Sequence, residues 1–277
     1  MTFQLGMAQI VVEGGQPQAN LARGVEQIKK AAATGCQLVV LPECMDLGWM
    51  DGSAQQIAMP IPGAYSDQLA CEAKNSSVYV IAGLVEREGD KVYNAAVMIN
   101  PDGHICLHHR KINVLEIAQN LYSIGDRLAV TSTPMGMVGI NICADNFSDS
   151  LAIGHVLARM GAQILVSPSA WVVDTDHDNT EDPYGDLWRT SYRQMSMLYD
   201  LTVVGVSCVG SLTNGPWRGR KAIGCSLAVG PGGEILAQGP YGADAESLIV
   251  VKVDPQPVVA KGTQFPAALG ARGYEGI

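Results

Sequence analysis

Three polar side chains of the types needed for nucleophilic catalysis stand at the ends of predicted strands. Glu43 follows QLVVLP, Lys111 ends HICLHHRK, and Cys143 ends MVGINIC. A cysteine attacks carbon efficiently only as a thiolate, and its ordinary pKa of about 8.5 leaves a few per cent ionised at neutral pH. A nearby ammonium and the start of a helix just downstream stabilise a thiolate, and a nearby carboxylate relays its proton. Together the three residues predict attack on an electrophilic carbon.

Each of these residues has a simpler interpretation when it is considered alone. A cysteine in an apolar strand is usually a small core residue, and a carboxylate or lysine after a strand is usually solvated. Cys44 is a poor rival nucleophile, because adjacent side chains on an extended chain point to opposite faces. The combination favours a catalytic site, since ligands of open α/β sheets collect beyond the carboxyl ends of the strands.

The elements that must position these side chains alternate between strands and helices. The pattern predicts strands at 3–10, 36–42, 137–143 and 163–169, a helix at 17–33, and a helix capped by Ser148 or Asp149 that aligns Ile153, Leu157 and Met160 on one face. The segments TGCQLVVLP and MGAQILVSP share Gly, Gln and a final Pro at equivalent places. They indicate two related strand–helix–strand units within one domain, each with a right-handed crossover.

The remaining segments complete one α/β domain. Strands predicted at 78–86, 92–99 and 104–112 form a meander, a helix at 186–199 carries a stripe of Trp188, Tyr192, Met195 and Tyr199, and later strands are predicted at 201–210, 221–230, 233–238 and 247–253. The last residues contain several glycines and little periodicity. We therefore expect a domain at 1–260 and a C-terminal arm at 261–277.

The composition excludes several classes of protein. The chain has 277 residues, 47% apolar and 16% charged, which is enough for one large globular domain. The formal net charge of −9 argues against a nucleic-acid partner, which requires clustered Lys and Arg. No apolar run approaches the roughly 18 residues of a membrane span. Seven cysteines without a secretory signal predict free thiols and a cytoplasmic location. Because no two cysteines have Cys-x-x-Cys spacing, the sequence does not predict a structural metal site.

The motifs around the three polar residues resemble those of a known enzyme family. VVLPE around Glu43, HHRKIN around Lys111 and GINICAD around Cys143 are similar to the Glu-Lys-Cys triad of the nitrilase, or carbon–nitrogen hydrolase, superfamily. Flanking segments fall in the same order as in that family: AQI (8–10), LYSIGDRL (121–128), GAQILVSPSAW (161–171) and GCSLAVGPGGEIL (224–236). The resemblance implies a four-layer αββα sandwich with two mixed sheets face to face and helices outside. It also implies a homodimer or higher homo-oligomer that needs no cofactor.

The resemblance further implies hydrolysis of a small-molecule amide through a thioester. Cys143 would attack the amide carbon, while Glu43 accepts the thiol proton and returns one to the leaving ammonia or amine. The Lys111 ammonium and the Ala144 backbone N–H would stabilise the oxyanion, and Glu43 would then activate water to release the acid. The sequence Cys143-Ala144-Asp145 is similar to the amidase and carbamoylase branches. It implies a small carboxamide or N-carbamoyl substrate.

Three further positions have two interpretations each. Many amidases of the family carry a second glutamate after the lysine; here Glu116 stands earlier than that position and Gln119 nearer to it. Glu116 either orients Lys111 or the substrate, or is a loop carboxylate. Trp171 either walls the substrate pocket or packs in the core. Asn146 either contacts substrate or serves the start of the helix, and we favour the second.

Other functions fit parts of the pattern. A nitrile hydrolase on the same scaffold would use the same three residues. A binding protein that keeps the scaffold without turnover is an alternative, because the chain departs from the family pattern near Gln119 and Leu198. A Cys-His hydrolase would need His155 or His177 beside Cys143, but His155 lies on a predicted helix and His177 in the acidic loop DTDHDNTED.

Overall fold

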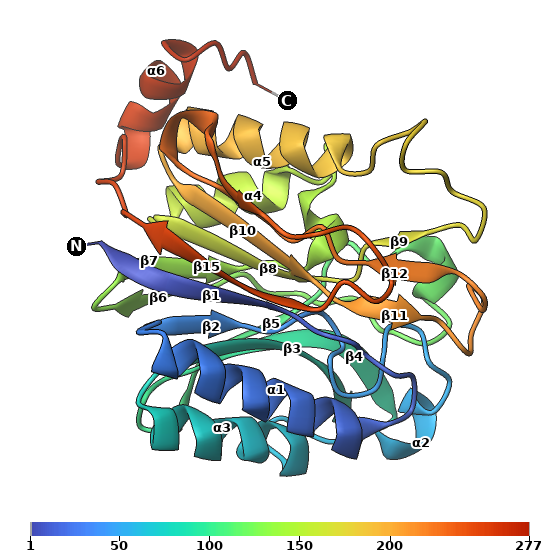
Figure 1. The fold of residues 1–277 in the computed structure, drawn as a ribbon. Helices are drawn as coiled ribbons and strands as arrows, with labels where there is room; N and C mark the ends of the chain where they lie inside the picture. Colours follow the sequence, from blue (N-terminus) through green and yellow to red (C-terminus); the bar gives the residue numbers. More distant parts are fainter. Residues whose placement is uncertain (1, 277) are drawn as a thin grey trace.

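The computed structural model describes residues 2–276 and shows two six-stranded sheets face to face between two layers of helices (Figure 1). The first sheet has the order β15-β1-β2-β3-β4-β5 and the second the order β14-β13-β10-β8-β7-β6. Helices α1 (Pro17–Ala33) and α3 (Ala64–Ser76) cover the first sheet, and α4 (Ala152–Arg159) and α5 (Asp186–Tyr199) cover the second. The predicted four-layer αββα sandwich is confirmed.

The strands of both sheets lie close to the predicted positions, except for Val130–Thr133, where no strand was predicted. In the first sheet they are β1 (Phe3–Gln9), β2 (Leu38–Val40), β3 (Tyr79–Glu88), β4 (Lys91–Ile99), β5 (Ile105–Arg110) and β15 (Ser247–Val253). In the second they are β6 (Val130–Thr133), β7 (Gly136–Ile140), β8 (Ile164–Ser169), β10 (Thr202–Ser207), β13 (Leu227–Val229) and β14 (Ile235–Gln238). The meander is confirmed, because β3, β4 and β5 pair in antiparallel order.

Two strand–helix–strand units occupy the middle of the two sheets. In the first unit β1 and β2 pair in parallel, with Leu5 opposite Leu38, and in the second β7 and β8 pair in parallel, with Val138 opposite Ile164. Strands β2, β8 and β10 are buried along their whole length. Burial on both faces explains why these strands are continuous apolar runs instead of alternating ones. The prediction of two related units is confirmed.

The predicted strands at 201–210 and 221–230 each break in two. The separated pieces β11 (Val209–Ser211) and β12 (Lys221–Ile223) join β9 (Val172–Val173) in a small three-stranded sheet. One break lies where Gly224 and Cys225 take positive φ angles of 67° and 59°. Such angles do not continue a strand, so the chain changes sheet there.

Helix α4 differs from the prediction in its first residue and in the position of Met160. The helix begins at Ala152 after Leu151, so Ser148 and Asp149 are not its caps. Residues Cys143–Asn146 form a short 3-10 helix, η2, which occupies the chain before α4 and delays its start. Met160 lies beyond the helix end and is 43% exposed, whereas Leu157 is buried as expected.

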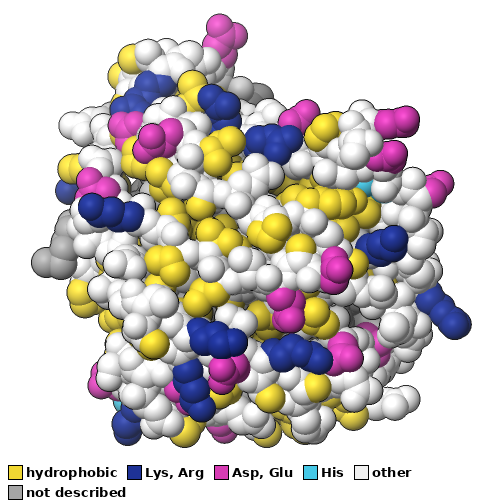
Figure 2. Space-filling view, viewed as in Figure 1, with side chains coloured by type: hydrophobic (Ala, Val, Ile, Leu, Met, Phe, Trp, Pro, Cys, Tyr) yellow, Lys and Arg dark blue, Asp and Glu magenta, His cyan; other side chains and the backbone are white. Residues whose placement is uncertain are grey.

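Helices α2 (Ala54–Ile57) and α3 were not predicted. Near the C-terminus, η4 (Gly262–Gln264) and α6 (Phe265–Gly270) fold back beside α5, with Phe265 and Leu269 buried. Arg272 donates to Asp200 at 2.7 Å. The boundary between a domain at 1–260 and a C-terminal arm stays a prediction. On the face shown in Figure 2, Lys and Arg side chains are scattered among Asp and Glu, without a continuous basic surface.

Candidate active site

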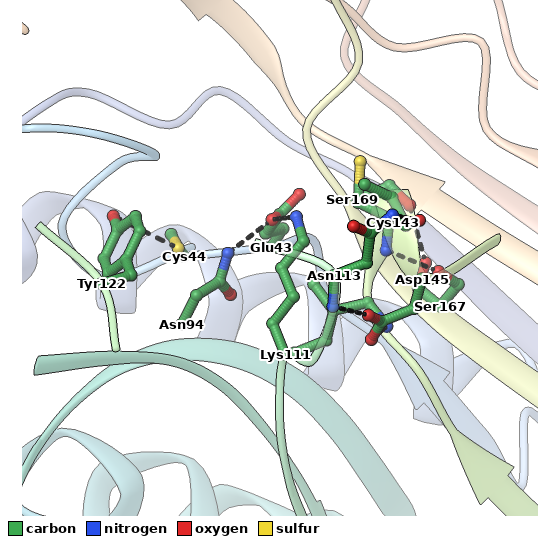
Figure 3. A network of polar contacts seen from close by, with 12 residues as sticks. Glu43, Cys44, Asn94, Lys111, Asn113, Tyr122, Cys143, Asp145, Ser167 and Ser169 are labelled. Atoms are coloured by element: carbon green, nitrogen blue, oxygen red, sulfur yellow. Dashed lines mark hydrogen bonds and ion pairs between the residues drawn. The ribbon is translucent and has the colours of Figure 1, made fainter. Parts of the chain in front are cut away.

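The ends of three strands bring the predicted chemical residues to one place. Glu43 follows β2, Lys111 follows β5, and Cys143 follows β7, so residues far apart in the chain meet at one end of the facing sheets (Figure 3). Lys111 Nζ donates to Glu43 Oε1 at 2.7 Å, and both side chains are at most 2% exposed. Cys143 is 8% exposed. The ion pair is held away from bulk water, and a buried pair is screened less by salt than an exposed one.

Tight backbone geometry holds Cys143. Cys143 has a φ of 43°, and its N–H donates to Ser167 Oγ at 2.9 Å. A positive φ in a residue other than glycine costs energy and persists only where surrounding contacts enforce it. Glu43 is fixed from the neighbouring sheet, because its N–H donates to the carbonyl of Ser169 at 3.2 Å. The main chain therefore sets the position of both side chains before any substrate is bound.

Asp145 ties the turn that carries Cys143 to the segment that follows Lys111. Its Oδ1 accepts from the N–H of Asn113 at 2.7 Å, and its Oδ2 accepts from the N–H of Ile142 at 2.9 Å and contacts His109 Nε2 at 2.9 Å. Burial raises the pKa of Asp145, but the hydrogen bond and charge of His109 and the backbone donor outweigh burial and lower it. Asp145 thus orders the turn.

The charges at the site differ from the simple thiolate expected from the sequence. Burial disfavours the Lys111 ammonium, but the charges of Glu43 and Cys143 and the hydrogen bond to Glu43 outweigh it, so the pKa of Lys111 is raised. Burial and then the Glu43 charge raise the pKa of Cys143, and Lys111 and the Ala170 N–H lower it only in part. Burial, and then the Glu43 charge, therefore outweigh the stabilisation of a thiolate by the Lys111 ammonium that the sequence analysis considers.

Asn94 is a polar residue of the site that sequence reasoning missed. Its Nδ2 donates to Glu43 Oε1 at 2.6 Å, and its side chain is buried. The one available signal was an asparagine within the apolar strand VYNAAVMI. Strand periodicity does not show which buried polar residue meets a carboxylate that comes from another strand.

The two candidates for a second glutamate position lie at the surface. Glu116 is exposed on η1 (Glu116–Ala118), and Gln119 is exposed and donates to the Val114 carbonyl at 3.2 Å. The orienting role of Glu116 stays a prediction, and its exposed position favours the loop-carboxylate interpretation. Among the residues described, Asn94 is the side chain that joins the Glu43–Lys111 pair.

The predicted substrate contacts have different surroundings. Trp171 is buried and stacks on Trp188 at 4.8 Å between ring centroids. Tyr184 and Tyr192 complete this aromatic group, and the charge of Cys143 adds to burial in raising the pKa of both phenols. The group therefore lies near Cys143 as well as in the core. Tyr184 was missed because it comes from a loop without periodicity.

The side chain of Asn146 is hydrogen-bonded to other protein side chains. Its Nδ2 donates to Asn141 Oδ1 at 3.0 Å and to Ser167 Oγ at 2.9 Å, and its Oδ1 accepts from Asn141 at 2.7 Å. These contacts support the structural role that we favoured over substrate contact. Ala144 follows Cys143 in η2 and is buried, and the role of its N–H toward substrate stays a prediction.

The histidines of the alternative Cys-His hydrolase lie elsewhere. His155 Nδ1 pairs with the Tyr199 hydroxyl at 2.7 Å in the helix layer, and the His177 ring lies 6.3 Å from the Tyr241 ring. Within residues 2–276, no group of three His, Cys, Asp or Glu side chains is arranged to hold a metal ion. The helices of the same range include none with the length and hydropathy needed to cross a bilayer.

Comparison with known proteins places the whole chain in one family. The model of the carbon–nitrogen hydrolase family matches residues 4–261. An omega-amidase NIT2 from Xenopus tropicalis is 29% identical over 278 residues, covering 95% of this chain and 93% of the relative. A nitrilase from Pyrococcus abyssi is 32% identical over 228 residues, covering 80% of this chain and 79% of the relative.

Solved structures share the fold at lower identity. A carbon–nitrogen hydrolase from Helicobacter pylori superposes with a TM-score of 0.79 at 21% identity, covering 98% of this chain and 93% of the other. An amidase from Nesterenkonia superposes with a TM-score of 0.74 at 19% identity, covering 92% of this chain and 90% of the other. With the family match over residues 4–261, the chain belongs to the carbon–nitrogen hydrolase family of the nitrilase superfamily.

Proposed function

We propose that this carbon–nitrogen hydrolase is a thiol amidohydrolase that uses Glu43, Lys111 and Cys143. Its substrate is a small carboxamide or N-carbamoyl compound, and its intermediate is a thioester on Cys143. The observation that carries the proposal is the buried ion pair between Lys111 and Glu43, at 2.7 Å, next to the Cys143 thiol. A charged pair with this burial is costly unless it serves structure or chemistry, and here it stands beside a nucleophile.

The first step forms the thioester. Glu43 accepts the thiol proton as the sulfur of Cys143 bonds to the carbonyl carbon, and the carbonyl oxygen becomes an oxyanion. The Lys111 ammonium and the Ala144 N–H stabilise that oxyanion. The carbon–nitrogen bond then breaks as Glu43 gives its proton to the leaving nitrogen, so ammonia or an amine departs and Glu43 is again a carboxylate.

The second step releases the acid. Glu43 accepts a proton from water as the water oxygen bonds to the thioester carbon. The carbon–sulfur bond then breaks, the carboxylic acid leaves, and the thiolate takes the proton from Glu43. Because the pKa of the Cys143 thiol is raised by burial and by the Glu43 charge, proton transfer accompanies attack instead of preceding it.

The relatives support this chemistry. The curated relatives include omega-amidases. In two mutants of the Nesterenkonia amidase, acrylamide and the acetamide part of fluoroacetamide add covalently to the active-site cysteine. Nitrile hydrolysis is the second candidate, because the Pyrococcus relative is a nitrilase.

The test is ammonia release from separate panels of carboxamides, N-carbamoyl compounds and nitriles. We expect the wild type and Cys71→Ala to turn over amides, and Cys143→Ala to show only background, because Cys71 is an exposed free thiol. Mass spectrometry after a rapid quench should find an acyl group on Cys143. Equal turnover by Cys143→Ala would reject the proposal, and turnover of nitriles alone would favour the nitrilase.

The absence of any turnover would favour the non-catalytic binding homologue. That reading also requires that an electrophile label Cys143 no faster than a free thiol. Labelling far faster than the exposed Cys71 would instead support an activated nucleophile.

We also propose a homodimer or higher homo-oligomer in the cytoplasm, with a domain at 1–260 and an arm at 261–277. The family resemblance supports the oligomer, and the seven free cysteines support a reducing compartment. Light scattering at micromolar concentration should give at least twice the mass of one chain, and a monomer mass would contradict the proposal.

A further inference from the structure

The two oxygens of Glu43 have different surroundings. Oε1 accepts from Lys111 Nζ at 2.7 Å and from Asn94 Nδ2 at 2.6 Å. Oε2 is buried and, among the residues described, has no hydrogen-bond partner. Figure 3 shows Asn94 and Lys111 converging on the same side of the carboxylate. An unpaired buried oxygen on a charged group is costly, so its retention calls for an explanation.

We propose that Asn94 is a positioning residue that, together with Lys111, occupies Oε1 and leaves Oε2 as the atom that accepts the proton from Cys143. The inference rests on the proposed function and deepens it, since it names the oxygen that acts as the base. A carboxylate with both oxygens bonded would first have to release a donor. With Oε1 bonded twice, Oε2 is free without any rearrangement.

The orientation of the Asn94 amide follows from the charge of its partner. An ionised carboxylate only accepts hydrogen bonds, so Asn94 must present its NH₂ group to Glu43. A hydrogen bond to an ionised oxygen is also stronger than one between neutral groups. The amide therefore stabilises Glu43 as a base, and it does so without adding a charge that would compete with Lys111.

The backbone fixes Asn94 at this place. It lies within β4, opposite Val85 of β3, and its own carbonyl accepts from the Lys111 N–H at 2.8 Å. Asn94 thus holds the backbone of Lys111 and the side chain of Glu43 at once. The N–H of Val85 in turn donates to Asp46, three residues after Glu43. One strand pairing sets the distance between the base and the ammonium.

Two substitutions at Asn94 test this role through the pH dependence of kcat/KM for the amide that the wild type hydrolyses best. Asn94→Ala removes the donor, so we expect kcat/KM to fall about 10- to 100-fold. The acid limb should move up by about one pH unit, because the ionised carboxylate loses a stabilising partner. Asn94→Asp keeps the shape but places a second carboxyl against Glu43. Two such groups share one proton, so its acid limb should move further.

Asn100→Ala is the matched control. Asn100 follows β4, and its Oδ1 accepts from the N–H groups of Asp102 and His104 in a turn outside the site. We expect this variant to lose some thermal stability and to keep the wild-type pH profile. A residue with only a structural role would behave in the same way at position 94.

The outcomes separate the two proposals. Wild-type acid limbs in Asn94→Asp and Asn94→Ala, with turnover that still needs Cys143, would overturn the role of Asn94 and leave the proposed function standing. Turnover that survives Cys143→Ala would overturn the proposed function and this inference with it. If Asn94→Ala does not fold, the nearly isosteric Asn94→Asp decides the question alone. A shifted acid limb in Asn94→Asp, together with a wild-type pH profile in Asn100→Ala, would support the inference.

Discussion

The two strand–helix–strand units share a backbone and differ in chemistry. Leu5 pairs with Leu38 in the first unit as Val138 pairs with Ile164 in the second. Counting from these pairs, Glu43 after β2 is equivalent to Ser169 at the end of β8, and Cys143 after β7 is equivalent to Ile10 after β1. Each unit therefore offers two strand ends to the site, and each uses a different one.

The difference teaches that a strand end becomes reactive through what a third element brings to it. Glu43 receives Lys111 and Asn94 from β5 and β4, which belong to neither unit. Its equivalent Ser169 instead donates to the Ser167 carbonyl at 3.1 Å within its own strand. The repeated backbone positions the side chains, and the meander supplies the charges.

The largest effect on turnover should come from replacing the side chain at Glu43, compared with replacing its equivalent, Ser169. Glu43→Gln keeps the shape but removes the base, so kcat/KM should fall about 10²- to 10⁴-fold. Ser169→Ala removes only a local hydrogen bond, and the carbonyl that accepts from the Glu43 N–H stays in place. We expect it to change kcat/KM by less than about 10-fold. Equal losses in the two variants would show that turnover depends on the Ser169 end of the second unit as much as on Glu43.

The strand ends were predictable because their causes are local. The continuous apolar run QLVVLP marks a buried strand before Glu43, and Lys111 and Cys143 each stand at the end of another predicted strand. The helices at 17–33 and 186–199 were predicted with the bounds that the structure shows.

Asn94, Tyr184 and the exposed position of Glu116 were not predictable, because they depend on which strands pair and where a loop folds. The raised pKa of Cys143 has the same origin. It results from the burial of three charged or ionisable groups together, and no single segment of sequence records that.

A second contrast between the units concerns the position eight residues after the first paired residue of β2 and of β8, which carries an acidic side chain in the first unit only. Asp46 in the first unit is equivalent to Val172 in the second, and it is buried and accepts from the N–H groups of Leu47 and Val85. Burial raises its pKa to about 7, although the N–H groups of Val85 and Leu47 oppose this. The folded protein then keeps a proton that the unfolded chain loses between about pH 4 and 7. This carboxyl should therefore lower stability as the pH rises through that window.

Asp46→Asn should remove this dependence, because an amide oxygen still accepts from Leu47 and Val85 but carries no charge. Relative to the variant, the wild type should lose up to about 4 kcal/mol of unfolding free energy between pH 4 and 7, at 1.4 kcal/mol for each unit of pKa. Urea unfolding of both proteins at several pH values measures the difference. Parallel curves would mean that Asp46 stays ionised in the folded protein.

The smallest effect concerns the glycine that lets each first strand approach its helix. A methyl group at Gly6 would lie 3.0 Å from the Ala31 Cβ on α1, whereas one at Gly139 would lie 2.9 Å from the end of the Leu165 side chain. Leu165 can turn aside, but a helix Cβ moves only with its backbone. Gly6→Ala should cost about 1–3 kcal/mol, as overpacking usually does. Gly139→Ala should cost less, because a flexible neighbour yields and the unfolded chain loses entropy.

Urea midpoints at a constant slope give both unfolding free energies. A larger cost for Gly139→Ala would show that the second unit, which carries Cys143, is the more rigidly packed of the two. The second unit would then have the tighter helix–strand packing of the two. The strained turn at Cys143, with its φ of 43°, would be supported by that packing. A smaller cost means that the turn is held by polar contacts such as those of Asp145 instead of by helix packing.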